Sequence, residues 1–452
     1  MLEKVLLWFR VPRGRLFRPS TLRPVARCSV VLMAFVAAGM ISAQTPQAEV
    51  TSSSTVSPPP DAADAEATGS VKNVTEDLPL ATELESQAEH MREHLKKMRT
   101  LAIKYHLSDG PGESKPIQRE WLKMLETGRN IHRSMVEAAM TDYRRDPKPD
   151  SPTAAFLFDV AARNADADRF DGMLEVVSLL KESGFTSPQF DLCFGLTAAA
   201  TGEFELAKPH LEIARANIEK AMVDLSTQKE LTDDQREAMG KKMFEVYGLL
   251  SELSDAEHLR PLWEEELKAR EADAAGEPLP RVLIQTTKGE FEIELFEEQA
   301  PNTVANFISL CEKGFYDGLP FHRVITHFMA QGGCPNGDGS GGPGYSIRTE
   351  LDGKTHRNFF RGTLGLAMAN APNSGGSQFY VCYVPRAYLN GKYVAFGRVI
   401  TGMNVLSDFT HINPDDKDAK DHAHGLPDEI ISTKVVRKRA HPYKPETIPE
   451  VK

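Results

Sequence analysis

The chain contains no apolar run as long as a comfortable bilayer span of about 20 residues. The apolar stretch at residues 29–41 (SVVLMAFVAAGMI) is shorter, and it follows a basic segment at residues 1–27. It runs into ISA, which ends at Ala43 and suits cleavage by a signal peptidase. We therefore predict that residues 1–43 are a signal peptide. The protein would then be exported, to the periplasm of a diderm bacterium or otherwise by secretion. The alternative is an uncleaved N-terminal membrane anchor, which is the only membrane contact that the sequence allows.

Cysteine is scarce, with five residues in a chain of 452. No two of them stand at a C-x-x-C spacing or at the Cys/His spacing of a metal site, so we predict no metal centre built on cysteine. Cys28 would leave with the signal peptide. Export makes a disulfide between Cys334 and Cys382 conceivable. We favour four unpaired and mostly buried thiols, at Cys193, Cys311, Cys334 and Cys382.

Positive charge is also in short supply. The chain has 53 Lys and Arg against 64 Asp and Glu, which gives a net charge of −11. Proteins that bind nucleic acid use basic side chains to neutralise phosphates, so we predict no nucleic-acid partner. With 41% hydrophobic and 26% charged residues the chain is globular, and its length predicts two or three domains.

Residues 44–80 are rich in Ser, Thr, Pro, Ala and acidic residues. Such a segment buries too little apolar surface to offset the entropy of ordering, so we predict a disordered linker. We expect a second disordered segment, a tail at residues 439–452.

Residues 81–275 show apolar residues at three- and four-residue spacing and almost no strand pattern, which predicts an all-helical region. Two stretches align with a shift of 34 residues, so that Phe158 matches Leu192 and Phe170 matches Phe204. That period is the one of tetratricopeptide (TPR) repeats, and we expect a TPR-like domain that could bind a protein partner. The alternative is a plain helical bundle.

The pattern changes to short strands after a linker that ends at Pro280. Eight strand candidates follow, at residues 281–287, 290–296, 321–324, 328–332, 363–369, 377–384, 394–399 and 429–436. The first two flank Lys288-Gly289, which suits a tight hairpin turn. Residues 300–314 and 402–409 are typical of short helices. We predict an eight-stranded closed antiparallel β-barrel with two capping helices at residues 281–438, since closure removes exposed edges.

Three separated motifs in this second domain carry a family resemblance. GLPFHRVITHFMAQGG (residues 318–333), GTLGLAMANAPNSGGSQFYV (residues 362–381) and YLNGKYVAFGRV (residues 388–399) resemble the cyclophilin family of peptidyl-prolyl cis/trans isomerases, in order and in spacing. The resemblance covers about a third of the chain. It implies the closed barrel, an isomerase activity on X-Pro bonds of polypeptides, and no cofactor or metal.

The resemblance also implies the site residues. Arg323 and Gln331 are the expected catalytic residues, with Arg323 stabilising the twisted X-Pro amide. The expected substrate-binding residues are His322, Phe328, Met329, Ala369, Asn370, Gln378, Tyr380, Tyr388, Leu389 and Tyr393. An arginine suits the role because it stays charged and presents several donors in a rigid fork. Phe328, Met329 and Leu389 would form the apolar cup for the proline ring.

Three tyrosines depart from the best-known members of the family. Tyr380 stands where Phe is frequent, and its hydroxyl needs a partner or a path to water. Tyr388 stands where cyclosporin-sensitive members have Trp, which predicts weaker cyclosporin binding. Tyr393 replaces a His, which removes a group that titrates near neutral pH. None of these changes removes the arginine.

Two other patterns have ordinary explanations. The glycine-rich stretches at residues 337–345 and 373–378 lack the lysine and the strand–loop–helix setting of a phosphate loop, so we read them as turns that shape a groove. The segment from His411 to Glu429 also holds His422 and His424 beside several aspartates. Its spacing fits no standard metal site, and we interpret it as a solvated loop.

Three hypotheses about the whole protein remain at this point. In the first, the chain is an exported isomerase that assists the folding of exported proteins. In the second, it is a non-catalytic module that binds Pro-containing segments beside a helical scaffold. In the third, the helical region is the main functional unit. The retention of Arg323, Phe328, Met329 and Gln331 favours the first hypothesis.

Overall fold

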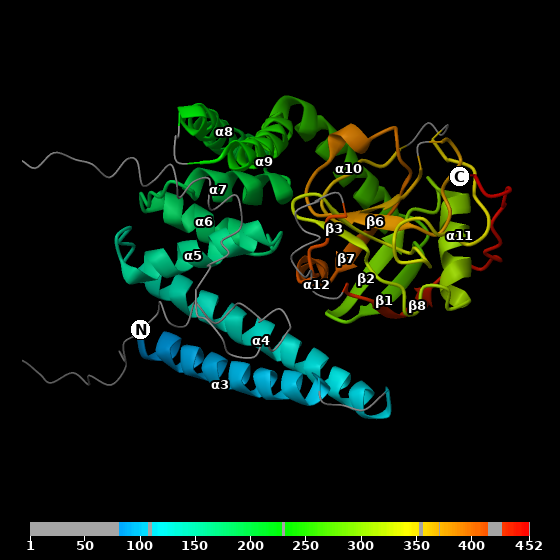
Figure 1. Cartoon of the computed structure of the whole chain (residues 1–452), viewed down its shortest axis with the longest axis horizontal. Helices are drawn as coiled ribbons and strands as arrows, with labels where there is room; N and C mark the ends of the chain where they lie inside the picture. Colours follow the sequence, from blue (N-terminus) through cyan, green and yellow to red (C-terminus); the bar gives the residue numbers. More distant parts are fainter. Residues whose placement is uncertain are drawn as a thin grey trace, which may run out of the picture.

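The computed structural model describes residues 81–106, 111–227, 231–351, 356–369, 371–414 and 427–451. The predicted signal peptide and the predicted linker at residues 44–80 lie outside these ranges. Among the helices in them, none is both long enough and apolar enough to span a membrane. A helical region precedes a domain built on one curled sheet (Figure 1).

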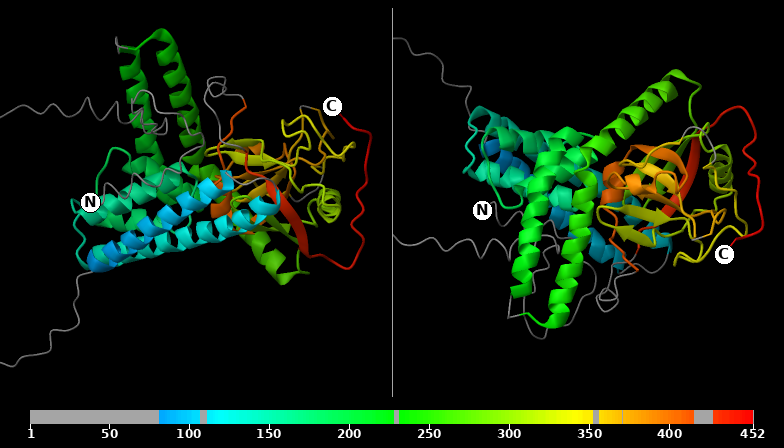
Figure 2. Two further views of the ribbon diagram at one scale, coloured as in Figure 1. Left: turned by 60° about the horizontal axis from the view of Figure 1, so that its bottom comes forward. Right: turned by 90° about the horizontal axis from the view of Figure 1, so that it is seen from above.

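The helical region consists of α3 (Ala81–His106), α4 (Pro111–Arg145), α5 (Pro152–Asp166), α6 (Met173–Glu182), α7 (Phe190–Ala200), α8 (Phe204–Thr227), α9 (Asp233–Leu253) and α10 (Ala256–Ala275). At the N-termini of several of these helices, a capping side chain accepts a hydrogen bond from a backbone amide of the first turn. The Ser151 hydroxyl accepts from the Ala154 amide at α5, and Thr232 forms a capping box with Gln235 at α9. The α8–α9 hairpin extends beyond the other helices (Figure 2).

Small residues let these helices pack closely. A Cβ added at Gly195 of α7 would come within 2.6 Å of the Leu211 side chain of α8. Nearly every residue of α7 is buried, which makes it the central helix of the region. The helical character predicted for this region is confirmed, whereas its TPR-like nature stays a prediction.

The second domain holds β1 (Arg281–Thr286), β2 (Gly289–Leu295), β3 (Arg323–Ile325), β4 (Met329–Gly332), β5 (Thr363–Leu366), β6 (Phe379–Cys382), β7 (Ala395–Thr401) and β8 (Ile430–Arg437). These form one antiparallel sheet in the order β3-β4-β6-β5-β7-β2-β1-β8. The eight predicted strands are confirmed, together with the two helices α11 (Pro301–Glu312) and α12 (Met403–Ser407).

The β1–β2 turn lies one residue earlier than the sequence suggests. Thr286 pairs with Gly289, so Thr287 and Lys288 form the turn. Gly289 is the first residue of β2, and its φ of 137° is open only to glycine at low cost.

The ends of the sheet approach each other without pairing β3 to β8. The Gly318 and Phe321 amides, which precede β3, donate to carbonyls of Ile430 and Asp428 at the start of β8. The fold is therefore a strongly curled antiparallel sheet, and full closure into a barrel stays a prediction.

The C-terminal segment corrects one expectation. Residues 439–451, which we expect from the sequence to be part of a disordered tail, lie along the sheet domain. The buried Tyr443 hydroxyl donates to Glu297, and His441 also pairs with Glu297. A backbone bridge joins Ile448 to Ser346. Contacts with residues more than 100 positions away order this segment, and a local composition argument cannot detect them.

Each face of the sheet has its own apolar cluster, because strand side chains alternate. The inner core includes Val324, Ala330, Val381 and Leu364, packed with α11. The other face carries a smaller cluster, which we call the site cluster. It consists of Met329, Phe359, Tyr380, Cys382, Leu389 and Ala395, with Ile325, Phe328, Ala367 and Tyr393 packed against it.

The two domains share buried surface. Phe360 and Val384 of the sheet domain belong to the core of the helical region, and the Phe360 ring meets those of Phe204 and Trp263 with centroids 6.2 and 4.7 Å away. The predicted boundary near Pro280 is therefore a boundary in the sequence between two domains that pack together.

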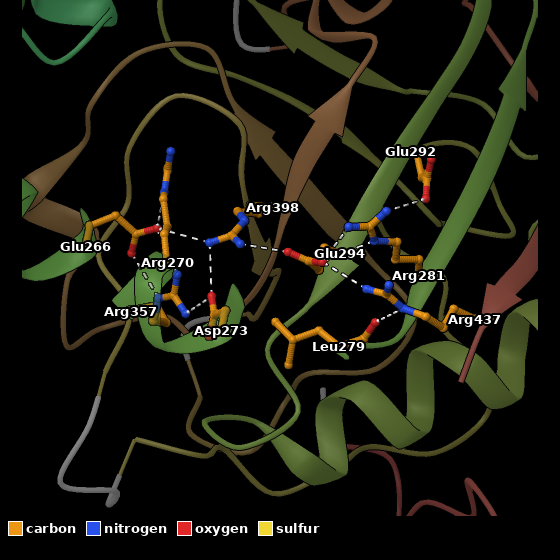
Figure 3. A network of polar contacts seen from close by, with 10 residues as sticks. All are labelled: Glu266, Arg270, Asp273, Leu279, Arg281, Glu292, Glu294, Arg357, Arg398 and Arg437. Carbon is orange, nitrogen blue, oxygen red and sulfur yellow. Dashed lines mark hydrogen bonds and ion pairs between the residues drawn. The ribbon is translucent and has the colours of Figure 1, made fainter. Parts of the chain in front are cut away.

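A polar network reinforces this junction (Figure 3). Arg357 donates to both Glu266 oxygens, each at 2.9 Å, and to Asp273 at 2.9 Å. Arg398 of β7 then links Asp273 to Glu294 of β2. Burial by itself would raise the pKa of Glu266, but hydrogen bonds and charge from Arg357 and Arg270 outweigh it and hold that pKa below its usual value.

Candidate active site

A row of side chains crosses four strands on the site-cluster face. Arg323 of β3 stands opposite Gln331 of β4, Gln331 opposite Tyr380 of β6, and Tyr380 opposite Gly365 of β5. Three residues named by the sequence analysis thus share one line across the sheet. A Cβ at Gly365 would fall 2.2 Å from the Tyr380 ring, so the glycine makes room for that ring.

Phe328 lies between two arginines. The guanidinium carbon of Arg323 is 5.6 Å from the centre of its ring, and that of Arg386 is 5.2 Å away. Met329 follows it and is buried in the site cluster, whereas Phe328 is half-buried against that cluster. Arg323 on β3 thus lies beside an apolar surface that Phe328 in the β3–β4 turn and Met329 on β4 form.

Gln331 and Gln378 connect the row to a glycine-rich loop. The Gln331 amide donates to the Gln378 side chain at 3.0 Å, and Gln378 donates to the carbonyls of Gly339 and Gly341 at 2.8 and 2.9 Å. Both side chains are half-buried. Gln378 therefore connects the loop at residues 337–345 to the cross-strand row, whereas the role of this loop as a groove wall stays a prediction.

The rim of the cluster carries Leu389, Tyr388 and Tyr393. Leu389 is buried, and Tyr388 is 47% exposed with its ring centroid 6.3 Å from that of Phe328. Tyr393 meets the Tyr380 ring edge-on at 6.0 Å. Burial raises the pKa of Tyr388 to about 12, so its hydroxyl stays neutral.

Tyr380 presents an unpartnered donor at the base of the cluster. The residue is only 6% exposed, and its hydroxyl has no hydrogen-bond partner among the described residues. Burial raises the pKa of this phenol well above its usual value. The sequence analysis anticipates that this hydroxyl needs a partner, and the protein itself supplies none in the described ranges.

The remaining predicted residues are less informative. His322 is buried next to Arg323, and burial lowers its pKa, so it is neutral at neutral pH. Ala369 is exposed, while Asn370 lies outside the described residues. His411 contacts Thr326 at 2.9 Å, and both His422 and His424 fall outside the described ranges.

The cysteine prediction is confirmed. Cys193, Cys311, Cys334 and Cys382 are free and buried. Cys382 belongs to the site cluster, and burial raises the pKa of its thiol to about 12. It is therefore an apolar wall residue and no nucleophile.

The domain that carries these residues matches a known protein family. The family model described as cyclophilin type peptidyl-prolyl cis-trans isomerase matches residues 281–435. A peptidyl-prolyl cis-trans isomerase of Synechococcus elongatus is 48% identical over 120 residues, which is 26% of this chain and 80% of that protein. The chain belongs to the cyclophilin family.

Other similar proteins carry the same name. Peptidyl-prolyl cis-trans isomerase B of Bacillus subtilis is 48% identical over 26% of this chain and 82% of its own. A solved Cryptosporidium parvum cyclophilin type isomerase, crystallised in the presence of the dipeptide Ala-Pro, is 34% identical, with a TM-score of 0.30 over 35% of this chain and 99% of that one. On the family match and the two bacterial relatives, the C-terminal part of the chain is a cyclophilin-type peptidyl-prolyl cis-trans isomerase domain, preceded by the helical region.

Two residues beside the predicted site residues were not predicted from the sequence. Arg386 and Phe359 lie against Phe328 and Tyr380, with Phe359 stacked on Tyr380 at 5.8 Å. Arg386 stands two residues before Tyr388, so its proximity to the third motif could have drawn attention to it. Phe359 precedes the second motif and carries no such signal.

Proposed function

We propose that this chain isomerises X-Pro bonds in exported polypeptides, with Arg323 as the catalytic residue and the site cluster as the seat of the proline ring. An X-Pro bond turns slowly because amide resonance raises a barrier of about 18–20 kcal/mol. In the twisted state the prolyl nitrogen regains its lone pair and can accept a hydrogen bond. No bond is made or broken to another group, so holding and polarising the amide is enough.

Each part of the mechanism has a residue to perform it. Phe328, Met329 and Leu389 hold the ring, so that rotation moves the carbonyl on the other side of the bond. Arg323 donates to the nitrogen or to the flanking carbonyl in the twisted state. Gln331 orients the peptide backbone beside it. Because the arginine contributes most where charge has shifted, it lowers the barrier more than it tightens binding.

The observation that carries this proposal is the cross-strand row. The register alone sets Arg323, Gln331 and Tyr380 side by side on the face that bears Met329 and Leu389. A cation held at the edge of an apolar surface is what a neutral, twisting amide requires.

Replacing the arginine tests the catalytic role. We expect Arg323→Ala to lower kcat/KM for a Pro-containing peptide by about a hundredfold, which is typical of losing one transition-state donor. Arg323→Lys is the matched control. It keeps the charge and loses the planar fork, so an intermediate rate is expected. If the wild-type chain and Arg323→Ala isomerise the peptide at the same rate, the non-catalytic binding module becomes the better account.

The export and partner assignments rest on the sequence. The signal-like N-terminus places the substrates among exported proteins, and the helical region offers a surface to a protein partner or to those substrates. The mass of the mature protein checks export: a chain that begins at Gln44 supports it, and a chain that retains residue 1 supports the membrane-anchored alternative.

A further inference from the structure

The turn between α5 and α6 reaches into the cyclophilin domain. The backbone carbonyl of Asp168 accepts from the Ser407 hydroxyl at 2.9 Å, and Asp171 pairs with Arg361 at 2.9 Å. Phe170 of the same turn is fully buried beneath the Arg361 guanidinium. The turn is therefore a structural contact between the two domains.

The Asp168 side chain has a more specific target. One carboxylate oxygen accepts from the backbone amide of His327 at 2.9 Å, and the other contacts the His327 ring nitrogen Nδ1 at 2.7 Å. The Asp168 side chain is 1% exposed and that of His327 is 11% exposed. A buried carboxylate needs such partners, because removing it from water without them is costly.

His327 occupies the β3–β4 turn in a conformation that favours glycine. Its φ is 55°, in the left-handed region that side chains other than glycine enter at a cost. The next residue is Phe328, so the His327 backbone sets where the Phe328 ring begins. Two contacts from the Asp168 carboxylate of the other domain hold the backbone and the ring of this turn residue.

A second link from the helical region meets the same turn. Arg386 donates to the carbonyl of His327, and it pairs with Glu252 of α9 at 2.8 Å. The Arg386 guanidinium also lies over the rings of Phe328 and Tyr388. The helical region thus holds both the amide and, through Arg386, the carbonyl of the residue before Phe328.

We propose that Asp168 is a positioning residue for the isomerase: by holding His327, it places Phe328 against Arg323, so that the helical region forms part of the catalytic unit. This inference rests on the proposed function, since it requires Phe328 to contact the proline ring. Asp168 touches no substrate. It acts through the β3–β4 turn.

The test compares variants of the full chain in peptide isomerisation. We expect Asp168→Ala to lower kcat/KM by about tenfold, mainly through a higher KM, because a displaced Phe328 weakens the seat of the ring. Asp171→Asn is the matched control. It breaks an ion pair from the same turn to the cyclophilin domain without touching His327, and it should keep the wild-type kcat/KM.

A rescue separates positioning from simple loss of structure. Glycine adopts a φ of 55° without help, so His327→Gly added to Asp168→Ala should restore most of the lost kcat/KM while the thermal stability stays low. If Asp168 only stabilises the fold, the added His327→Gly substitution should not restore kcat/KM. If Asp168→Ala does not fold, Asp168→Asn carries the same prediction with a smaller loss, because its amide oxygen still accepts one of the two bonds.

The same set of assays includes the Arg323→Ala variant. The affinity of each variant for the peptide is measured directly as well. An active wild type, a slow Arg323→Ala and an Asp168→Ala with the wild-type KM and rate would overturn the positioning role alone. Equal rates for wild type and Arg323→Ala would overturn the proposed chemistry. In that case, peptide affinity still decides the positioning role, since it should fall in Asp168→Ala and stay unchanged in Asp171→Asn.

Discussion

Two of the polar contacts between the helical region and the cyclophilin domain differ in what they hold. At α10, Glu266 and Asp273 bind Arg357 and Arg398, and the network continues through Glu294 into the sheet (Figure 3). At the α5–α6 turn, the Asp168 carboxylate binds the backbone amide and the ring of His327. The first contact joins several elements that other interactions also anchor, whereas the second restrains one short turn.

An interface can therefore stabilise a protein at one place and adjust its reaction at another. Breaking the α10 network leaves buried charges without partners, so its cost falls on folding. Breaking the Asp168 contact frees a turn that carries Phe328, so its cost should fall on the reaction. The following predictions test that separation.

The largest expected effect comes from Glu266, which is 3% exposed. Glu266→Ala leaves the buried Arg357 with Asp273 as its remaining carboxylate partner in this network, and we expect a loss of about 3–5 kcal/mol in the free energy of unfolding. Urea denaturation measures it. At urea concentrations too low to unfold the variant, kcat/KM should stay within about twofold of wild type. Phe359 of the site cluster lies near Arg357 in the sequence, but a separate hydrogen bond from its backbone amide to Asn390 holds it in place.

Glu264 provides the control on the same helix. It is exposed and pairs with the exposed Arg260 at 3.7 Å, so Glu264→Ala should cost about 0.5 kcal/mol or less. Equal losses in the two variants would show that burial of the network does not matter.

The second expected effect is a dependence of the isomerase on pH. Burial lowers the pKa of His327, but the charge and hydrogen bond of Asp168, with Asp166, outweigh both burial and Arg386, and the pKa is raised above 6.5. A raised pKa means that the ion pair is fully present below pH 6.5 and is lost as the pH rises through the folded value. We therefore expect kcat/KM to fall a few-fold on the alkaline side.

A pH profile of His327→Gly serves as the comparison. Without the imidazole, the alkaline fall should vanish. Tyr388, with its pKa raised to about 12, does not titrate in that range. The same fall in both proteins would assign the titration to another group.

The smallest expected effect belongs to a third contact between the domains. Arg129 of α4 donates to Asp408 at 2.8 Å and to the Lys288 carbonyl at 2.7 Å, and both side chains are partly exposed. Arg129→Gln should cost about 1 kcal/mol of stability. Its kcat/KM should equal that of wild type, and a loss as large as in Asp168→Ala would mean that any damage to the interface disturbs the site.

Much of the fold and of the site followed from local pattern. The alternation of Phe291, Ile293 and Leu295 predicts β2, and the stripe of Val304, Phe307 and Ile308 predicts α11, because burial of one face imposes its period on the sequence. The resemblance carried by three motifs predicts that Arg323 and its neighbours form the site. Local pattern failed at residues 439–451, whose order comes from Glu297 and Ser346.

Side-chain type and short-range spacing are enough to predict the helical and the strand-rich regions, and the resemblance carried by three motifs names the residues expected to act on an X-Pro bond. Only the tertiary structure decided that Asp168 meets His327, 159 residues away, and that Glu252 meets Arg386. Such pairs leave no repeating pattern in the sequence, because a long-range contact constrains the two residues that meet and places no requirement on the residues between them.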